Sequence, residues 1–584
     1  MPRHLSLFMR HLTTAIIFCI LAFALYGHVL NGEFISDDHS YIVENLAIRN
    51  LFDLPGLWRS FSTRFLVMIS FALNYRLHQL ATFGYHLVNV FIHIINALLV
   101  VVLTRLTFRM PAIKNSPGAV RAESVAFYAG LIFLCHPIQT QAVSFITQRA
   151  TSMAVLFYIL ALVGYAQARI TGRSVFWFFS WTAMLLGVFA KEMIVTVPVT
   201  VLVYEIYFGQ DLRRHWKHLA PYGLIAVLVL LVFSADQPGS VLGLKGQLSK
   251  GGFDWRYFLT EINVLRTYLR LLFIPVNQVH HYAYFLSKSF FEPATLGSFF
   301  LLAGIMVAAL RIRRWDRFMS FSMLWFFIAT SVEFWVVCLV KRGVLYEHWL
   351  YLPMVGFSVF LSLGLHQIMP RAVFAKAILI LVVGIYCVLT LLRNFVWQTE
   401  IGFWEDVVRK SSQAPLVYLG SGTAYQRQAR LEEAFAHYQR GIQLFLERKR
   451  KLNENDRATL SSIYNNLGLI YERRGLREQA VRSYQNAYRH NMYNPSPYRN
   501  LANICLRTRK FQQAIFLLNQ EMLVMPNDPE IYYGLGLAYM GLEQSGKARA
   551  MLKRAENLYN RYGYSARAEG MRSILERLSL NDNP

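Results

Sequence analysis

The stretch LTTAIIFCILAFALYGHVLNGEFISDD, residues 12–38, decides the fold of this chain. Its first part, residues 12–30, is apolar for roughly 18 residues, which is long enough for a helix to cross a bilayer. The tripeptide Ala22-Phe23-Ala24 resembles a signal-peptide cleavage site, but the length of the apolar run favours an uncleaved first membrane helix. The stretch then turns polar and ends in two adjacent carboxylates, Asp37 and Asp38, where the helix should emerge into water.

The composition of the whole chain is that of a membrane protein with several spans. Of its 584 residues, 55% are hydrophobic, and the mean hydropathy is +0.32. The 59 Lys and Arg exceed the 34 Asp and Glu, giving a formal net charge of +25. The basic residues stand in short clusters between apolar runs, a pattern that suits membrane topology and anionic lipid better than nucleic acid.

About eleven apolar segments are expected to span the membrane. They lie near residues 12–30, 85–104, 122–138, 151–168, 174–190, 193–208, 219–234, 295–310, 318–340, 347–366 and 373–392. Clusters of Lys and Arg fall on every second connection, so the positive-inside rule places the N-terminus in the cytoplasm and the alternate loops outside. The segment 257–275 is also apolar but carries Glu261, Arg266 and Arg270 at helical spacing, and we expect an interfacial or re-entrant helix there.

An internal repeat begins after the last apolar segment. Gly468, Ala502 and Gly536 recur with a period of 34 residues within the similar phrases NNLGLIY, RNLANIC and YGLGLAY. An earlier copy starts near Gly422 and is separated by the charged run ERKRKLNENDRA. Small residues at fixed positions let paired helices approach closely, which is typical of a tetratricopeptide-repeat solenoid, here with about four repeats. We therefore predict an all-α fold with a membrane domain over 1–393, a connecting segment over 394–409 and a repeat domain over 410–584.

Two interpretations of Asp37 and Asp38 follow from their position. A carboxylate at the membrane surface can act as a general base that removes a proton from an attacking hydroxyl. Alternatively, the pair forms a solvated turn after the helix, with Asp38 or Ser40 as a helix cap.

Further charged residues interrupt or flank the apolar segments on the same predicted side. They include Arg149, Lys191 with Glu192, and Arg342, which shortly precedes His348. Charges placed in a membrane are costly, and a phosphate group would compensate several of them through charge-assisted hydrogen bonds. The alternative for each single Lys or Arg is a helix end whose charged group reaches the interface.

The sequence shows no pattern typical of a metal site or of a set of disulfide bonds. The five cysteines are scattered, and no spacing suggests a disulfide framework or a metal site. His86 and His93 share one helix face, but no tight cluster supplies three ligands, so we expect packing or hydrogen bonding there. The pair His280-His281 with nearby tyrosines could line a sugar site by stacking or belong to an interfacial aromatic belt.

Several motifs resemble one known family. FISDDHSYIVENLAIRN, HPIQTQAVSFITQRA, AKEMIVTVPV and YEHWLYLPMVGF, in that order and followed by the repeats, are similar to the transmembrane and tetratricopeptide-repeat (TMTC-like) protein O-mannosyltransferases and their bacterial relatives. The chain departs from the family pattern in three places. Phe65 stands where the family commonly has Pro after Arg64, Gln148-Arg149-Ala150-Thr151 replaces Gly-Arg-Ala-Asp, and His348 replaces an Arg.

The resemblance implies a membrane glycosyltransferase of the GT-C superfamily. Such an enzyme transfers a sugar, here mannose or a similar hexose, from a polyprenyl phosphate to Ser or Thr hydroxyls of proteins on the non-cytoplasmic face, with inversion. One aspartate of the pair would be the base, with Asp38 preferred and Asp37 orienting it, while Arg149 and Lys191 would lie near the lipid phosphate. The predicted site residues are Asp38 and Asp37 for catalysis and, for the lipid phosphate and donor, Arg149, Lys191, Glu192, Arg342, His348 and Arg64.

The remaining expectations concern partners and location. No cofactor or metal is required, although a divalent cation is compatible with this chemistry. The repeats would present acceptor proteins from the periplasmic side of a bacterial inner membrane, and no nucleic acid is expected. Two other classes stay open, namely a GT-C enzyme that glycosylates lipid or polysaccharide, and a non-enzymatic membrane scaffold whose repeats bind partners.

Overall fold

The computed structural model describes residues 3–210, 212–234, 252–282, 284–341, 343–369, 371–447, 452–562 and 564–581. Throughout these residues the regular structure is helical and no strand occurs, so the predicted all-α class is confirmed. Contacts divide the chain into two compact units, Met1–Phe403 and Trp404–Pro584, which we call the membrane unit and the repeat unit. The division falls inside the segment 394–409 that the sequence predicted to connect two domains.

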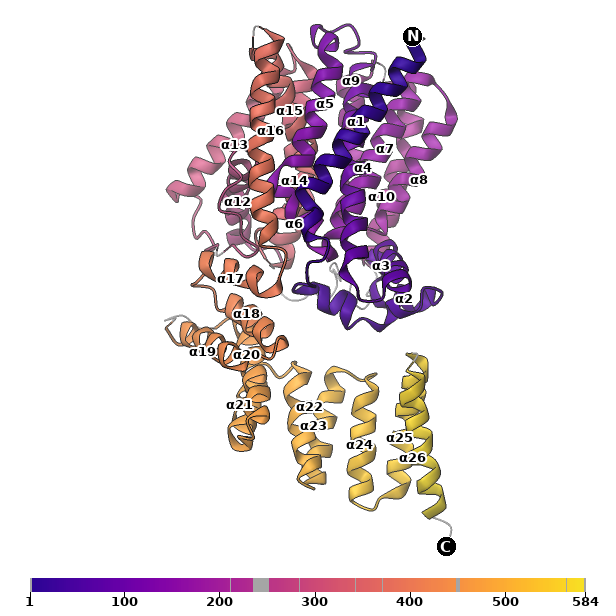
Figure 1. Cartoon of the computed structure of the whole chain (residues 1–584), viewed down its shortest axis with the longest axis vertical. Coiled ribbons are helices and arrows are strands. Elements are labelled where there is room, and N and C mark those ends of the chain that lie inside the picture. Colours follow the sequence, from indigo (N-terminus) through magenta and orange to yellow (C-terminus); the bar gives the residue numbers. More distant parts are fainter. Residues whose placement is uncertain are drawn as a thin grey trace. The chain divides into compact units, whose positions relative to one another are not determined.

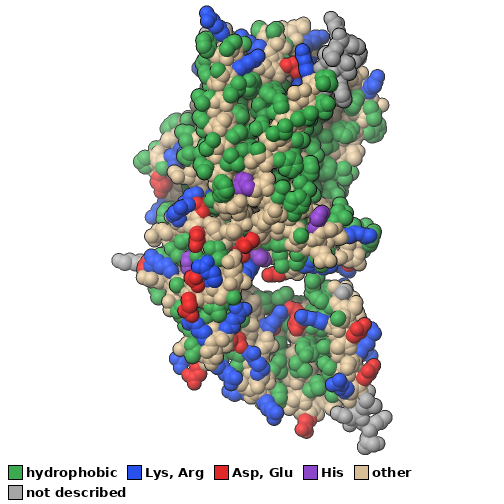
Figure 2. Space-filling view, viewed as in Figure 1, with side chains coloured by type: hydrophobic (Ala, Val, Ile, Leu, Met, Phe, Trp, Pro, Cys, Tyr) green, Lys and Arg blue, Asp and Glu red, His purple; other side chains and the backbone are tan. Residues whose placement is uncertain are grey.

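The membrane unit is built mainly of long apolar helices (Figure 1). Its α-helices are α1 (Arg3–Tyr26), α2 (Leu54–Phe61), α3 (Phe65–His78), α4 (Thr82–Phe108), α5 (Ala122–Cys135), α6 (Thr140–Ser144), α7 (Arg149–Thr171), α8 (Ser174–Val188), α9 (Val197–Phe208), α10 (Leu212–Ser234), α12 (Trp255–Phe273), α13 (Pro293–Ile312), α14 (Arg317–Val340), α15 (Pro353–Ile368) and α16 (Ala372–Phe395). Hydrophobic side chains cover much of the flank of this unit in Figure 2, whereas blue Lys and Arg side chains gather at its upper end.

Each of the eleven predicted spans overlaps one of these helices. Within the described residues, seven segments are long and apolar enough to cross a membrane. They include α1, α4, α5, α7, α13, α14 and α16, while α8 and α15 are shorter apolar helices. The total number of spans therefore stays a prediction. The segment 257–275 forms the helix α12, which is not among the seven.

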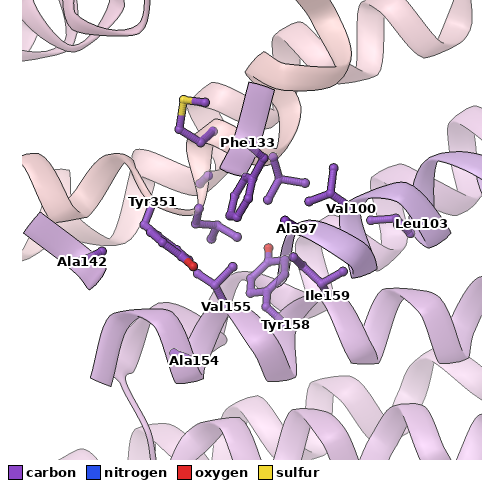
Figure 3. Packing of buried hydrophobic residues seen from close by; sticks show 14 of the residues in the cluster. Ala97, Val100, Leu103, Phe133, Ala142, Ala154, Val155, Tyr158, Ile159 and Tyr351 are labelled. Carbon is purple, nitrogen blue, oxygen red and sulfur yellow. The ribbon is translucent and has the colours of Figure 1, made fainter. Parts of the chain in front are cut away.

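Close helix packing fixes the centre of the membrane unit. Ala97 and Val100 on α4 lie near Phe133 on α5 and Tyr158 on α7 in Figure 3. Small side chains at such contacts let membrane helices approach closely. His93 hydrogen-bonds through Nδ1 to the Tyr351 hydroxyl at 2.8 Å and through Nε2 to the Leu134 carbonyl at 3.1 Å, so this histidine serves helix packing.

The repeat unit consists of four helix pairs and a last helix, as the 34-residue period predicted. After α17 (Glu400–Lys410), the helices are α18 (Pro415–Arg427) with α19 (Leu431–Glu447), α20 (Glu454–Arg473) with α21 (Arg477–His490), α22 (Pro495–Arg507) with α23 (Phe511–Val524), α24 (Pro529–Gly541) with α25 (Ser545–Arg561), and α26 (Ser565–Asn581). A Cβ atom at Gly422 would collide with the Tyr438 ring, and one at Gly468 with the Tyr484 ring. The recurring small residues are therefore required by the close contact inside each pair.

Candidate active site

The segment 33–39, which we call the acid loop, is held in a strained conformation. Ser36 has a φ of +50°, an uncommon value for a residue with a side chain. The Ser36 N–H donates to Glu400 Oε1 at 3.2 Å, and the Glu400 N–H donates to Glu33 Oε2 at 2.8 Å. A π-helical turn, His39–Val43, follows directly. The start of α17 thus fixes the loop just before the two aspartates, and such outliers persist only where surrounding contacts hold them.

Asp38 points into the protein. Its side chain is 1% exposed, and its two oxygens accept hydrogen bonds from the Ile35 N–H at 3.1 Å and the Thr147 N–H at 2.8 Å. Burial raises the pKa of Asp38 to about 7, although the two amide hydrogen bonds oppose the rise. Asp38 therefore joins the acid loop to the segment before α7.

Asp37 is the accessible carboxylate of the pair. Its side chain is exposed, and its backbone carbonyl accepts a hydrogen bond from Ser40 Oγ at 3.0 Å. Desolvation by surrounding protein atoms raises the pKa of Asp37, and the positive charge of Arg64 partly offsets this rise. The geometry does not support the sequence-based preference for Asp38 as the base, because a base must contact the hydroxyl it deprotonates.

Arg64 is the cation whose charge acts on the Asp37 carboxylate. It ends the short 3-10 turn Ser62–Arg64, and its side chain is partly exposed. Its guanidinium carbon lies 5.3 Å from the ring centre of Phe61 and 5.7 Å from that of Tyr41. No hydrogen bond or ion pair joins the Arg64 side chain to another of the described residues, so its five donors are available to an anion.

Lys191 is buried and is paired inside the protein. It is 3% exposed, its Nζ donates to Thr151 Oγ1 at 3.0 Å, and it forms an ion pair with Glu333 Oε1 at 4.0 Å. Burial lowers the pKa of Lys191, whereas the negative charges of Glu333 and Glu192 raise it. Glu192 is partly exposed at the start of the next turn. Lys191 therefore contributes charge to the site from a buried position.

Arg149 is a predicted phosphate ligand that lies in the protein interior. Its side chain is 0% exposed, and Nε donates to Asn89 Oδ1 at 2.7 Å. Its other nitrogens donate to Asn74 Oδ1 at 2.7 Å, Ser70 Oγ at 3.0 Å and the Tyr85 carbonyl at 2.8 Å. These contacts engage Nε and both terminal nitrogens of the guanidinium. In this structure Arg149 therefore joins α3, α4 and α7 through buried hydrogen bonds, and its role in donor binding stays a prediction.

His348 hydrogen-bonds to Gln141, a glutamine that was not among the predicted site residues. Gln141 Oε1 accepts from the His348 backbone N–H at 2.7 Å and lies 3.2 Å from His348 Nδ1. The Nε2 of the same glutamine is 2.9 Å from His280 Nδ1. Gln141 thus links two histidines from distant segments. Arg342 lies outside the described residues, and its predicted role in donor binding stays a prediction.

The predicted residues separate into two groups. Asp37, Arg64 and Glu192 are exposed or partly exposed, and Arg64 acts electrostatically on both Asp37 and Lys191. Asp38 and Arg149 are buried and hold loops and helices together. Glu333 and Gln141 were missed. A lone acid in the apolar segment 318–340 was the available signal for Glu333, whereas nothing in the local sequence marks Gln141. Among the described residues, no group of three or more His, Cys, Asp or Glu could hold a metal ion.

The pKa of Asp38 predicts how stability depends on pH. An unfolded Asp has a pKa of 3.8, whereas the folded value is about 7, so the folded state binds the Asp38 proton more tightly between these values. Stability should therefore fall as pH rises from 4 to 7, by ~4 kcal/mol for this group. The measurement is the unfolding temperature of the wild type minus that of Asp38→Asn at each pH. A difference that stays constant from pH 4 to 8 would contradict the buried position of this carboxyl.

Comparison with known proteins places the chain among relatives with named activities. The tetratricopeptide repeat family matches residues 461–489 and 529–562. The chain is 24% identical over 524 residues to "Protein O-mannosyl-transferase Tmtc3" of Drosophila melanogaster, covering 74% of this chain and 55% of that protein. It is 22% identical over 609 residues to "Protein O-mannosyl-transferase TMTC3" of Homo sapiens, covering 91% of this chain and 63% of that protein. The chain is TMTC-like.

This TMTC-like chain spans somewhat more than half the length of those two relatives, 55% and 63%. Their printed names describe protein O-mannosyl transfer, which concerns those proteins. Among solved structures, the crystal structure of MamA is 18% identical and covers 28% of this chain and 90% of its own, with a TM-score of 0.24.

Proposed function

We propose that the chain is a GT-C glycosyltransferase that moves a hexose from a polyprenyl phosphate to Ser or Thr hydroxyls of proteins. The reaction would take place on the non-cytoplasmic face of a bacterial inner membrane and invert the anomeric centre. The observation that carries the proposal is the exposed carboxylate of Asp37 in the electrostatic field of the partly exposed Arg64. Similarity to named protein O-mannosyl-transferases supports the choice of a hexose and of protein acceptors.

Asp37 acts as the general base in this mechanism. Its carboxylate takes the proton of the acceptor hydroxyl while the hydroxyl oxygen bonds to the anomeric carbon. The bond from that carbon to the phosphate oxygen breaks, and the polyprenyl phosphate leaves with the electron pair. Because the hydroxyl attacks opposite to the leaving phosphate, a single displacement inverts the configuration. The raised pKa of Asp37 makes it a stronger base than an ordinary aspartate.

Arg64 stabilises the leaving phosphate by direct contact. A planar guanidinium can hold a phosphate through two parallel hydrogen bonds, and the donors of Arg64 have no competing partner among the described residues. Lys191 acts without direct contact, because its Nζ already binds Thr151 and pairs with Glu333. Its positive charge lowers the energy of the negative charge that develops on the phosphate oxygens. Asp38 keeps the acid loop in position.

The class of sugar donor and the class of acceptor can be tested with the purified full-length protein. The donors are a polyprenyl-phosphate hexose and a nucleotide-activated hexose, and the acceptors are a folded protein, a polysaccharide and a glycolipid. We expect product only from the lipid phosphate donor and the protein acceptor, with inverted configuration of the transferred hexose. Product on the polysaccharide or the glycolipid, without product on the protein, would contradict the proposal and favour the other GT-C class.

The repeat unit offers a surface for recruiting acceptor proteins. An open groove of about 1030 Å³ lies between α21 and α23 and is floored by α22. Apolar Val481 and Phe516 line it together with basic Arg477 and Lys510. Since Phe516 is 62% exposed, a bound polypeptide could bury its ring.

This surface predicts a selective effect of Phe516→Ala. The KM for a native acceptor protein should rise about tenfold, corresponding to the loss of one buried aromatic contact, whereas transfer to a short free peptide should stay unchanged. Leu523→Ala is the matched control, because Leu523 lies on the same helix, is 77% exposed and is not part of the groove. An unchanged KM in Phe516→Ala, or an equal loss with both acceptors, would mean that this groove does not recruit acceptors.

A further inference from the structure

We propose that a basic pocket at the opposite end of the membrane unit binds the headgroup phosphate of an anionic phospholipid. The pocket has a volume of about 460 Å³ and lies where α4 ends and α5 begins. Three basic side chains, Arg105, Arg109 and Lys114, line it against a single acid, Glu123. The pocket therefore carries an excess of positive charge, and the proposed sugar-transfer site makes no use of it.

Arg105 gives the pocket a fixed donor. Its Nη2 pairs with Glu123 Oε2 at 2.8 Å, and its Nη1 lies 3.0 Å from His11 Nδ1. Its Nε is buried and has no hydrogen-bond partner among the described residues. A buried guanidinium N–H without an acceptor is costly, and the positive charge of Arg105 at the pocket wall attracts a phosphate. The exposed side chains of Arg109 and Lys114 can close over the same anion.

The position of the pocket relative to the bilayer identifies a lipid as its occupant. The candidate span Thr82–Phe108 ends one residue before Arg109, so these basic groups lie where lipid headgroups begin. The pocket also includes Val120, which is 91% exposed. An exposed valine beside three cations is poorly suited to water, but it suits the boundary between headgroups and acyl chains. Basic pockets between helix ends are the usual recognition sites for anionic headgroups.

The pocket is far from the acid loop. α4 begins next to Tyr85, whose carbonyl binds Arg149, and it ends at Phe108 beside the pocket. Its 27 residues correspond to a length of about 40 Å. The lipid bound here is therefore distinct from the sugar donor that the proposed function places at the other end. An anionic lipid at this position would hold the ends of α4 and α5 at the headgroup level.

Binding can be measured with the purified full-length chain in a neutral detergent. The probes are short-chain phosphatidylglycerol, phosphatidylcholine and inorganic phosphate, and the readouts are the bound lipid counted by native mass spectrometry and the shift in unfolding temperature. We expect saturable binding of phosphatidylglycerol, with at least tenfold weaker binding of the other two probes. Arg109→Ala with Lys114→Ala should weaken phosphatidylglycerol binding about 30-fold, since each cation near an anionic lipid contributes a factor of about five.

Two further variants sharpen the test. Glu123→Gln should tighten binding, because it removes the acid that competes for Arg105. Arg173→Ala with Arg371→Ala is the control, since both are exposed, carry the same charge and lie outside the pocket. Equal binding by the wild type and Arg109→Ala/Lys114→Ala, or equal losses in the control, would overturn the proposal. Inorganic phosphate binding as tightly as phosphatidylglycerol would show a soluble-anion site, and equal binding of phosphatidylcholine would exclude recognition of the headgroup charge.

Discussion

Replacing Asp37 by Asn is expected to lower kcat for sugar transfer by about 10²–10⁴-fold, the range over which a general base contributes. Asn has nearly the same shape as Asp but cannot accept the hydroxyl proton. Because the Asp37 side chain is exposed and its structural hydrogen bond uses the backbone carbonyl, the fold should be unaffected. The measurement is steady-state transfer from a polyprenyl-phosphate hexose by purified protein, together with its unfolding temperature.

Two comparisons make this result specific to Asp37. Glu44→Gln, an exposed acid six residues after Asp38, removes the same charge nearby and should leave kcat within about twofold of the wild type. At pH 4, where the contribution of Asp38 to stability is almost fully present, Asp38→Asn should lower the unfolding temperature, because the amide NH2 cannot accept an N–H in place of the second carboxyl oxygen. If Asp38→Asn kept full stability and lost more activity than Asp37→Asn, the two roles would be reversed from those assigned here.

Arg149→Lys should destabilise the membrane unit strongly, by about 2–5 kcal/mol, while leaving the KM for the donor unchanged in the folded fraction. The guanidinium of Arg149 is fully buried and donates to four groups on α3 and α4. An ammonium group has three donors in a different geometry, so it leaves buried acceptors without partners. The unfolding temperature and the donor KM are to be measured on the same preparation.

Arg173→Lys provides the control for this substitution. Arg173 is exposed between α7 and α8, and its replacement should leave the unfolding temperature unchanged. The opposite pattern at position 149, with normal stability and a strongly raised donor KM, would support the assignment of Arg149 to the lipid phosphate. Measuring the unfolding temperature and the donor KM together thus distinguishes a buried structural role of Arg149 from binding of the lipid phosphate.

The fold was accessible from the sequence because its determinants are local or periodic. Long apolar runs predict membrane helices from residue type alone, and the 34-residue spacing of Gly468, Ala502 and Gly536 predicts paired helices. The number of spans does not follow from the sequence, because short apolar helices such as α8 and α15 have the composition of a span but not its length. Whether a short helix crosses a bilayer depends on its neighbours, which no local pattern records.

The residue types of the candidate site could be predicted from the sequence, but the directions in which their side chains point could not. Adjacent acids and interrupting cations marked the correct loops, yet the sequence could not tell that Ser36 adopts a positive φ just before the pair, or that Asp38 points inward and Asp37 outward. A basic residue at the start of a helix is equally compatible with a phosphate ligand and with a buried tie. The structural contacts of Arg149 could not be read from the sequence, because its four acceptors come from segments 60 to 79 residues away along the chain.

The most direct test of the central claim is the intact mass of an acceptor protein after incubation with purified chain and a polyprenyl-phosphate hexose. We expect an increment of one or more hexose units on Ser or Thr with the wild type and with Glu44→Gln, and none with Asp37→Asn under the same conditions. An unmodified acceptor after incubation with folded wild type, or the same increment with Asp37→Asn, would contradict this claim.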